Sequence, residues 1–173
     1  SWALQIIFTH QRYASEGYIC FTMDNRGTWG RGHDFEKVIH KNMGDYELRD
    51  QVTGVKYLKS LPYVDSENIG ITGGSYGGYM TLHALFRAPE HFKAGISQFP
   101  ATDWRHYDTA NTERYMGKPQ DNEEAYKKAS TSTYSKGLKG HLYLMHGMMD
   151  NNVHVQQAFD QIEALLKAGK DFK

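Results

Sequence analysis

Short apolar runs alternate along the chain with segments whose apolar residues recur at helical spacing. The predicted strands are the apolar runs at 18–24, 68–74, 94–100 and 141–147. The predicted helices are the periodic segments at 45–61, 76–89 and 153–169. Alternation of this kind favours an α/β fold, in which helices flank a mostly parallel sheet on both faces.

One long span, 101–135, interrupts the alternation. It is polar, rich in aromatic residues and too long for a plain connection between a strand and a helix. We expect it to lie over the ends of the strands, because ligands of α/β sheets bind there.

Both ends of the chain look incomplete for such a sheet. Residues 1–15 have the pattern of a helix leading into a strand, and residues 170–173 look like the start of another strand. We therefore interpret residues 1–173 as part of a single α/β domain that is truncated at both ends.

Composition adds few limits. The 173 residues suffice for one domain with a sizeable core, and 20 Lys and Arg balance 20 Asp and Glu. We therefore expect no nucleic-acid partner, and no apolar run is long enough to span a bilayer. Cys20 is the one cysteine, stands in an apolar run and is predicted to be a buried thiol.

A serine flanked by glycines is the strongest chemical signal. Gly73-Gly74-Ser75-Tyr76-Gly77 matches G-x-S-x-G, after a predicted strand and before a predicted helix, which is the context the motif requires. We expect only glycine to fit at positions 73 and 77, because the turn must be tight enough to project the serine hydroxyl. Ser75 is thus the predicted nucleophile, and the Tyr76 N–H is predicted to hold an oxyanion. A glycine-rich turn without chemistry is the alternative.

Asp150 follows the predicted strand at 141–147, where an α/β-hydrolase places its triad acid. An ordinary turn or cap is the alternative, but Asn151 or Asn152 could cap the helix and leave Asp150 available. His154 begins the next helix, so its imidazole would point away from the serine, and we do not interpret it as the base. Because the other histidines precede Asp150, against the order serine, acid, histidine, we expect the base outside this chain.

Longer motifs narrow the family. GGSYGGYM at 73–80, DWRHYD and TERYMG within 103–117, and HGMMDNNVH at 146–154 occur in this order, after a glycine-rich DNRGTWGRG at 24–32. Over essentially the whole chain these segments resemble the catalytic domain of the dipeptidyl peptidase IV branch of the prolyl oligopeptidase family. Many hydrolases share the serine motif, whereas TERYMG and DNNVH are much narrower signals.

The resemblance implies roles for the catalytic residues. Ser75 matches the nucleophile, Tyr76 the residue whose N–H serves the oxyanion, and Asp150 the acid. Asn152 matches a side chain that binds the penultimate carbonyl of the substrate. The family's histidine would follow residue 173, and a further oxyanion tyrosine and the glutamates that hold the substrate ammonium would precede residue 1.

The resemblance also implies an apolar pocket for proline. Trp104, Tyr107 and Val153 match its walls together with Tyr76. Large aromatic walls suit the flat ring of proline, although Trp104 and Tyr107 could instead pack the 101–135 span onto the sheet. Asn111 stands where the family commonly has a pocket tyrosine, so the pocket could admit a different or larger residue.

The function implied is a serine peptidase domain, partnered by a β-propeller, that releases X-Pro or X-Ala dipeptides from peptides with free N-termini. It would act through an acyl-enzyme, with no metal or organic cofactor, and the isolated chain would be inactive without its histidine. The alternatives are an acylaminoacyl-peptidase, a tripeptidyl peptidase, an esterase or a non-catalytic binding domain. An open sheet edge would favour a homodimer, and the resemblance favours a periplasmic or secreted location.

Overall fold

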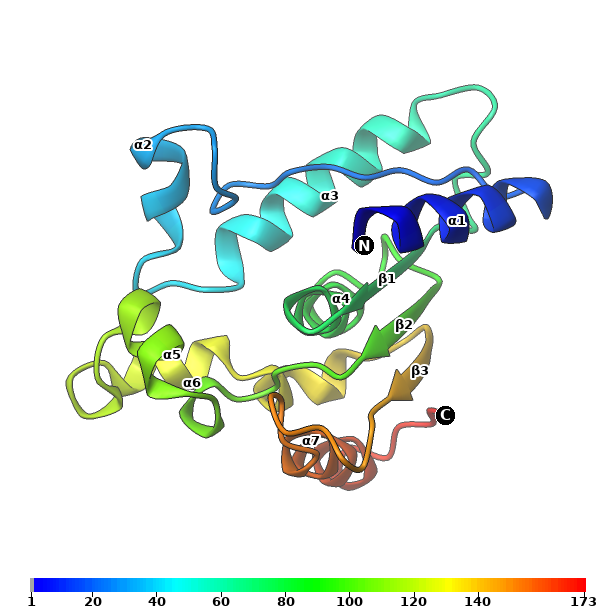
Figure 1. The fold of residues 1–173 in the computed structure, drawn as a ribbon. Helices are drawn as coiled ribbons and strands as arrows, with labels where there is room; N and C mark the ends of the chain where they lie inside the picture. Colours follow the sequence, from blue (N-terminus) through cyan, green and yellow to red (C-terminus); the bar gives the residue numbers. More distant parts are fainter. Residues whose placement is uncertain (1) are drawn as a thin grey trace.

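A small parallel sheet lies at the centre of the fold (Figure 1). The structure is a computed structural model that describes residues 2–173, with side chains from residue 8 onward. The strands, in sheet order, are β1 (Gly70–Gly74), β2 (Ala94–Gln98) and β3 (His141–Met145), and both neighbouring pairs are parallel. They confirm three of the predicted strands, each shortened by a few residues.

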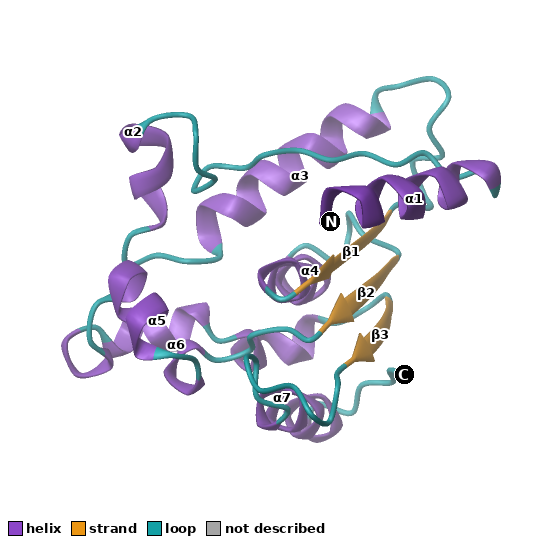
Figure 2. Ribbon diagram, viewed as in Figure 1, coloured by secondary structure: helices purple, strands orange, loops and turns teal. Residues whose placement is uncertain are grey.

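Helices and short 3-10 turns make up most of the remaining chain (Figure 2). The α-helices are α1 (Trp2–Ser15), α2 (His33–Glu36), α3 (Asp45–Lys59), α4 (Tyr76–Arg87), α5 (Thr109–Met116), α6 (Glu123–Ala129) and α7 (Gln156–Lys167). The 3-10 helices are η1 (Lys37–Ile39), η2 (Trp104–His106), η3 (Pro119–Asp121) and η4 (Thr131–Gly137). Helices α1, α3, α4 and α7 confirm the predicted helices, although residue 1 lies outside the described part. No described helix has the length and apolar character needed to cross a membrane.

Helix α4 is the centre of the hydrophobic core. It packs on β1, β2 and α3, and its Leu82, Ala84 and Leu85 are fully buried. Gly95 on β2 permits this approach, since a Cβ there would lie 2.7 Å from Leu85 Cδ1. The opposite face of the sheet is more open, with the side chain of Tyr143 exposed. The described helices therefore cover mainly one face, and the expectation of helices on both faces is met only in part.

The strand predicted at 18–24 is wrong. This segment pairs with no strand in the described chain and instead runs along α3 (Figure 1). There the Phe21 ring lies 6.5 Å from the Tyr57 ring. Most side chains of this run are exposed, and only Phe21 and Met23 come close to Gly54 of α3, so its apolar composition did not identify a strand. Cys20 is exposed on this segment, which makes the prediction of a buried thiol wrong as well.

Two other segments lie close to their expected places. Leu144 N–H donates to Lys173 O at 2.7 Å, and Lys173 N–H donates to Leu142 O at 3.0 Å, so the last residues pair alongside β3 as a parallel strand would. The 101–135 span is more regular than expected, since it contains α5 and α6. Figure 1 shows both helices on the side toward which the strands point.

Candidate active site

Ser75 occupies the turn between β1 and α4 in a strained backbone conformation. Its φ of 55° and ψ of −117° lie where residues other than glycine are seldom found. The turn is held because Ser75 N–H donates to Gln98 O at 2.9 Å, while Ser75 O accepts from Tyr79 N–H at 3.0 Å. The Ser75 side chain makes no capping hydrogen bond to α4, so its hydroxyl is left for other contacts.

Close backbone packing explains two glycines around this turn. A Cβ at Gly73 would lie 2.5 Å from the carbonyl carbon of Gly77, and a Cβ at Gly78 would lie 2.6 Å from Gln98 O. A Cβ at Gly77 would meet nothing within 4 Å outside its own helix backbone. The expectation that only glycine fits therefore holds at position 73 and is wrong at position 77, because the Gly77 Cα faces open space.

The register of the sheet brings the serine and the acid to the same edge. Gly74, Gln98 and Met145 are aligned across the three strands. Ser75 follows β1 directly and Asp150 lies in the loop after β3. Because parallel strands end at one edge, both residues lie where α/β sheets bind ligands, with the end of β2 between them.

Asp150 closes its own turn. Its Oδ1 accepts hydrogen bonds from the N–H groups of Asn152 and Val153, both at 2.9 Å. No side chain caps α7, whose N-cap is Val155, so the expectation that Asn151 or Asn152 caps the helix is wrong. Asp150 Oδ2 lies 3.7 Å from His146 Nε2, which is hydrogen-bonded to Val153 O at 2.7 Å. One carboxylate oxygen thus fixes the turn, and the other can accept from a further donor.

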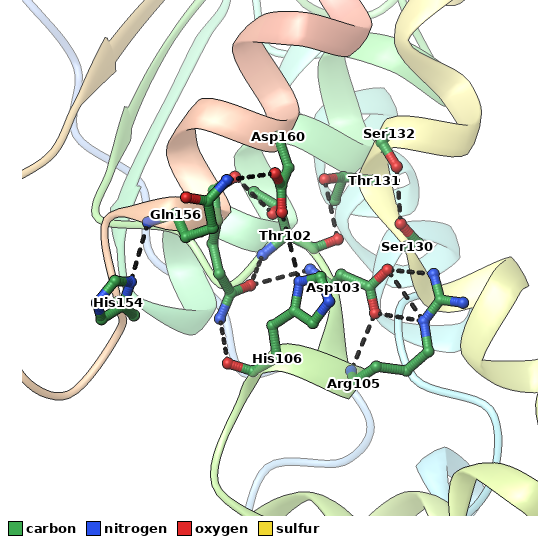
Figure 3. Close-up of polar contacts among 11 residues, drawn as sticks. Thr102, Asp103, Arg105, His106, Ser130, Thr131, Ser132, His154, Gln156 and Asp160 are labelled. Atoms are coloured by element: carbon green, nitrogen blue, oxygen red, sulfur yellow. Dashed lines mark hydrogen bonds and ion pairs between the residues drawn. The ribbon is translucent and has the colours of Figure 1, made fainter.

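His154 contacts backbone beside its own helix. The side chain is exposed, and Nδ1 accepts a hydrogen bond from Gln156 N–H at 3.3 Å (Figure 3). One ring nitrogen of His154 thus bonds the backbone at the start of α7. This is the structural role that its position at a helix start indicated.

The residues predicted to form the proline pocket gather around Trp104, which is buried. The Trp104 ring lies 5.6 Å from the Tyr76 ring and 5.8 Å from the Tyr107 ring, measured between centroids. Tyr107 Oη donates to Asn152 Oδ1 at 2.9 Å, next to Val153, which is 2% exposed. These five residues come from α4, from the 101–135 span and from the turn of Asp150, and the structure brings them together.

A cavity of about 480 Å³ borders this aromatic cluster. Tyr76, Trp104 and Asn111 line it, together with Trp29 from the glycine-rich loop at 24–32 and with Glu47. Asn111 is exposed on α5, and its backbone N–H donates to Asp108 Oδ1 at 2.8 Å. Asn111 therefore lies at the cavity, outside the buried part of the aromatic cluster.

Sequence reasoning missed Glu47, a buried carboxyl group in the first turn of α3. It is 1% exposed, and its Oε1 accepts from Tyr76 Oη at 2.5 Å. Burial raises the pKa of Glu47, and burial together with the Glu47 charge raises the pKa of Tyr76 well above its usual value. The only sequence signal was an acid three residues after Gly44, which looks like ordinary helix capping.

Sequence reasoning also missed Gln157, which is fully buried near the start of α7. Its Oε1 accepts from the N–H groups of Thr102 and Asp103 at 2.6 and 3.0 Å, and its Nε2 donates to His106 O at 3.3 Å. These bonds hold both ends of the segment that carries Trp104. Nearby, His106 Nδ1 lies 3.4 Å from Asp160 Oδ2, and this contact joins the same two elements (Figure 3).

No three His, Cys, Asp or Glu side chains gather into a metal site anywhere in the described range. A parallel sheet, a strained serine in a strand–helix turn and an acid after a later strand define the α/β-hydrolase class.

Comparison with known proteins agrees with this class. The model of the prolyl oligopeptidase family matches residues 4–173. Human dipeptidyl peptidase 8 is 40% identical over 163 residues, which are 92% of this chain and 18% of the human protein. The chain belongs to the prolyl oligopeptidase family, in its dipeptidyl peptidase IV branch.

Two crystal structures share the fold. A protein of Bacteroides ovatus assigned as a dipeptidyl aminopeptidase IV superposes with a TM-score of 0.93 and 42% identity, over 95% of this chain and 23% of its own. Dipeptidyl peptidase 4 of Porphyromonas gingivalis gives a TM-score of 0.84 and 42% identity, over 87% of this chain and 21% of its own. The chain thus spans about a fifth of the length of these relatives.

Proposed function

We propose that this chain supplies the nucleophile and the acid of a serine peptidase that releases N-terminal dipeptides. Ser75 Oγ attacks the carbonyl carbon of the second substrate residue, while its proton passes to a histidine from outside the chain that Asp150 orients. The Tyr76 N–H and a tyrosine from outside the chain stabilise the oxyanion. The proton then goes to the leaving amine, and water hydrolyses the acyl-enzyme to free the dipeptide and Ser75.

The observation that carries this proposal is the strained backbone of Ser75. A non-glycine residue at φ 55° costs folding free energy, and such strain persists where the surrounding structure holds it in place. Here the bonds of Ser75 to Gln98 and Tyr79 hold it, and the hydroxyl is left uncapped. The relatives described above are dipeptidyl peptidases, which supports the same reaction class.

The proposed substrates are peptides with a free N-terminus and proline or alanine in second position. Trp104 and Tyr107 would contact that residue, and Asn152 would bind the penultimate carbonyl. Asn111 faces a cavity of about 480 Å³ beside this wall, so we propose that residues larger than proline are also accepted.

The remainder of the protein is part of the proposal. We propose that it provides a β-propeller and the catalytic histidine, so the 173-residue chain would be inactive by itself. We propose that the full-length protein forms a homodimer.

The test uses a fluorophosphonate probe and a chromogenic X-Pro substrate with a free amino group. Each is applied to the 173-residue chain, to the full-length protein and to full-length Ser75→Ala. We expect labelling and turnover only in the full-length protein with Ser75. Activity of Ser75→Ala would refute the mechanism, and preference for an N-blocked substrate would indicate an acylaminoacyl-peptidase or esterase instead. A full-length protein that binds peptides without labelling would be a binding domain.

A further inference from the structure

Glu47 bridges two helices at the start of the serine turn. Its carboxylate accepts from Tyr76 Oη at 2.5 Å and from the Gly44 N–H at 3.0 and 3.1 Å. Tyr76 is the first residue of α4 and directly follows Ser75, whereas Glu47 lies in the first turn of α3. Figure 1 shows these two helices packed beside each other.

Capping alone does not require this burial. Acids in the first turn of a helix usually stay solvated, and removing a carboxylate from water costs several kcal/mol unless donors replace the water. Glu47 is 1% exposed, and Tyr76 Oη is the side-chain donor that compensates for this burial. The buried Glu47 carboxylate therefore depends on its hydrogen bond from the Tyr76 hydroxyl.

The Tyr76 ring has little freedom once this bond forms. Its centroid lies 5.2 Å from the Tyr79 ring and 5.6 Å from the Trp104 ring, so aromatic contacts hold its faces while Glu47 holds its hydroxyl. Because the ring and the N–H belong to one residue, fixing the ring also limits rotation of the backbone at the first turn of α4. The first N–H groups of a helix have no partner within the helix and can bind an anion.

We propose that Glu47 is a positioning residue for catalysis, which fixes the Tyr76 side chain and so aims the Tyr76 N–H at the oxyanion. The inference rests on the proposed function, since it assigns Glu47 a role in that reaction. Glu47 borders the cavity, but its Oε1 is bonded to Tyr76 Oη, so the proposed effect on catalysis passes through Tyr76.

A double-mutant cycle in the full-length protein tests this role. Glu47→Gln keeps the shape of the side chain, and Tyr76→Phe keeps both the ring and the backbone N–H. We expect each variant to lower kcat on the X-Pro substrate and the rate of fluorophosphonate labelling by about tenfold, because both reactions use the oxyanion site. The double variant should be no slower than the slower single variant, because both changes break one contact.

Glu163→Gln is the matched control, since Glu163 is exposed on α7, pairs with Lys167 at 2.6 Å and does not line the cavity. It should leave both rates unchanged. Two results would overturn the inference, provided that Ser75→Ala is inactive. One is a double variant whose fall in rate equals the product of the two single falls. The other is single variants whose kcat and labelling rate stay within about twofold of the parent. If Ser75→Ala retains activity, the proposed function itself fails. Should Glu47→Gln not fold, Tyr76→Phe decides alone: a tenfold fall supports the inference, and full activity refutes it.

Discussion

Tyr107 Oη donates a hydrogen bond of 2.9 Å to Asn152 Oδ1, and this contact joins the aromatic wall to the turn closed by Asp150. Tyr107 follows the segment that carries Trp104, whereas Asn152 lies two residues after Asp150. Because the amide oxygen of Asn152 accepts from Tyr107, its Nδ2 hydrogens are left to donate to a substrate carbonyl. The bond thereby orients the amide for the role that the proposed function gives it.

Tyr107→Phe should therefore weaken substrate binding more than catalysis. The ring and its contact with Trp104 remain, and only the hydrogen bond that orients Asn152 is lost. We expect KM for X-Pro substrates to rise about threefold to tenfold with kcat nearly unchanged, which steady-state kinetics of the full-length protein would measure. Tyr63→Phe is the control, because Tyr63 is 68% exposed and remote from this contact. An unchanged KM would contradict the orienting role.

Gln157→Met should destabilise the fold strongly, whereas Gln156→Met should not. The first change leaves the buried N–H groups of Thr102 and Asp103 without their acceptor. Each unsatisfied buried group costs roughly 1–3 kcal/mol, so the free energy of unfolding should fall by about 2–5 kcal/mol in urea titrations. Gln156 is exposed and bonds Asp160 at 2.8 Å, so its replacement should change stability by less than about 0.5 kcal/mol. Equal effects of the two changes would contradict the structural assignment.

Local signals predicted most of the sheet and helices that carry the site. Short apolar runs ending in glycine or proline indicated β1 and β2, and helical spacing indicated α3 and α7. The run at 18–24 has the composition of a strand but lies along α3 with most of its side chains exposed. The apolar pattern indicates which residues favour burial. It does not indicate which element would bury them, because that depends on contacts between residues distant in the sequence.

The sequence predicted those site residues that short local motifs mark. Ser75 and Asp150 could be found because a turn motif and a strand end mark them in the sequence. The supporting contacts could not be found in this way. Glu47 is 29 residues from Tyr76, and Gln157 is 55 residues from Thr102, so only the folded chain places them together.

His83 should make the folded state less stable as the pH falls below neutral. It is fully buried, and burial together with the nearby Arg87 guanidinium lowers its pKa to about 3. Between its unfolded pKa of roughly 6.5 and pH 3, the unfolded chain binds a proton at His83 that the folded chain does not. Stability from His83 is therefore complete above pH 6.5 and declines as the pH falls.

The loss should be on the order of 2 kcal/mol between about pH 6.5 and pH 4.5, measured by urea unfolding at each pH. Glu47 acts in the opposite direction, because its raised pKa lets the folded state bind the extra proton. The comparison is therefore with His83→Gln, which removes the histidine and should flatten the pH dependence, while the exposed His40→Gln should not. A parallel pH profile for the parent and His83→Gln would contradict the assignment.

Asn111→Tyr should narrow the substrate preference. A larger aromatic side chain at this position would fill part of the cavity beside Tyr76 and Trp104. We expect kcat/KM for X-Pro over X-Leu substrates to rise about tenfold, since a pocket rejects residues that no longer fit. Asn122→Tyr serves as the control because Asn122 lies beyond α5 and does not line the cavity. A ratio that stays constant in Asn111→Tyr would show that the cavity does not receive the second residue.

The glycines of the serine turn should respond oppositely to alanine. At Gly73 the new Cβ would lie 2.5 Å from the backbone of Gly77, so the strand or the helix must move, and the free energy of unfolding should fall by at least about 2 kcal/mol. At Gly77 the Cβ would meet nothing within 4 Å outside its helix, and alanine is the better helix former by roughly 1 kcal/mol. Gly77→Ala should therefore keep or raise the unfolding midpoint in urea. Destabilisation of the two variants by equal amounts would mean that the turn is packed on both sides, contrary to this structure.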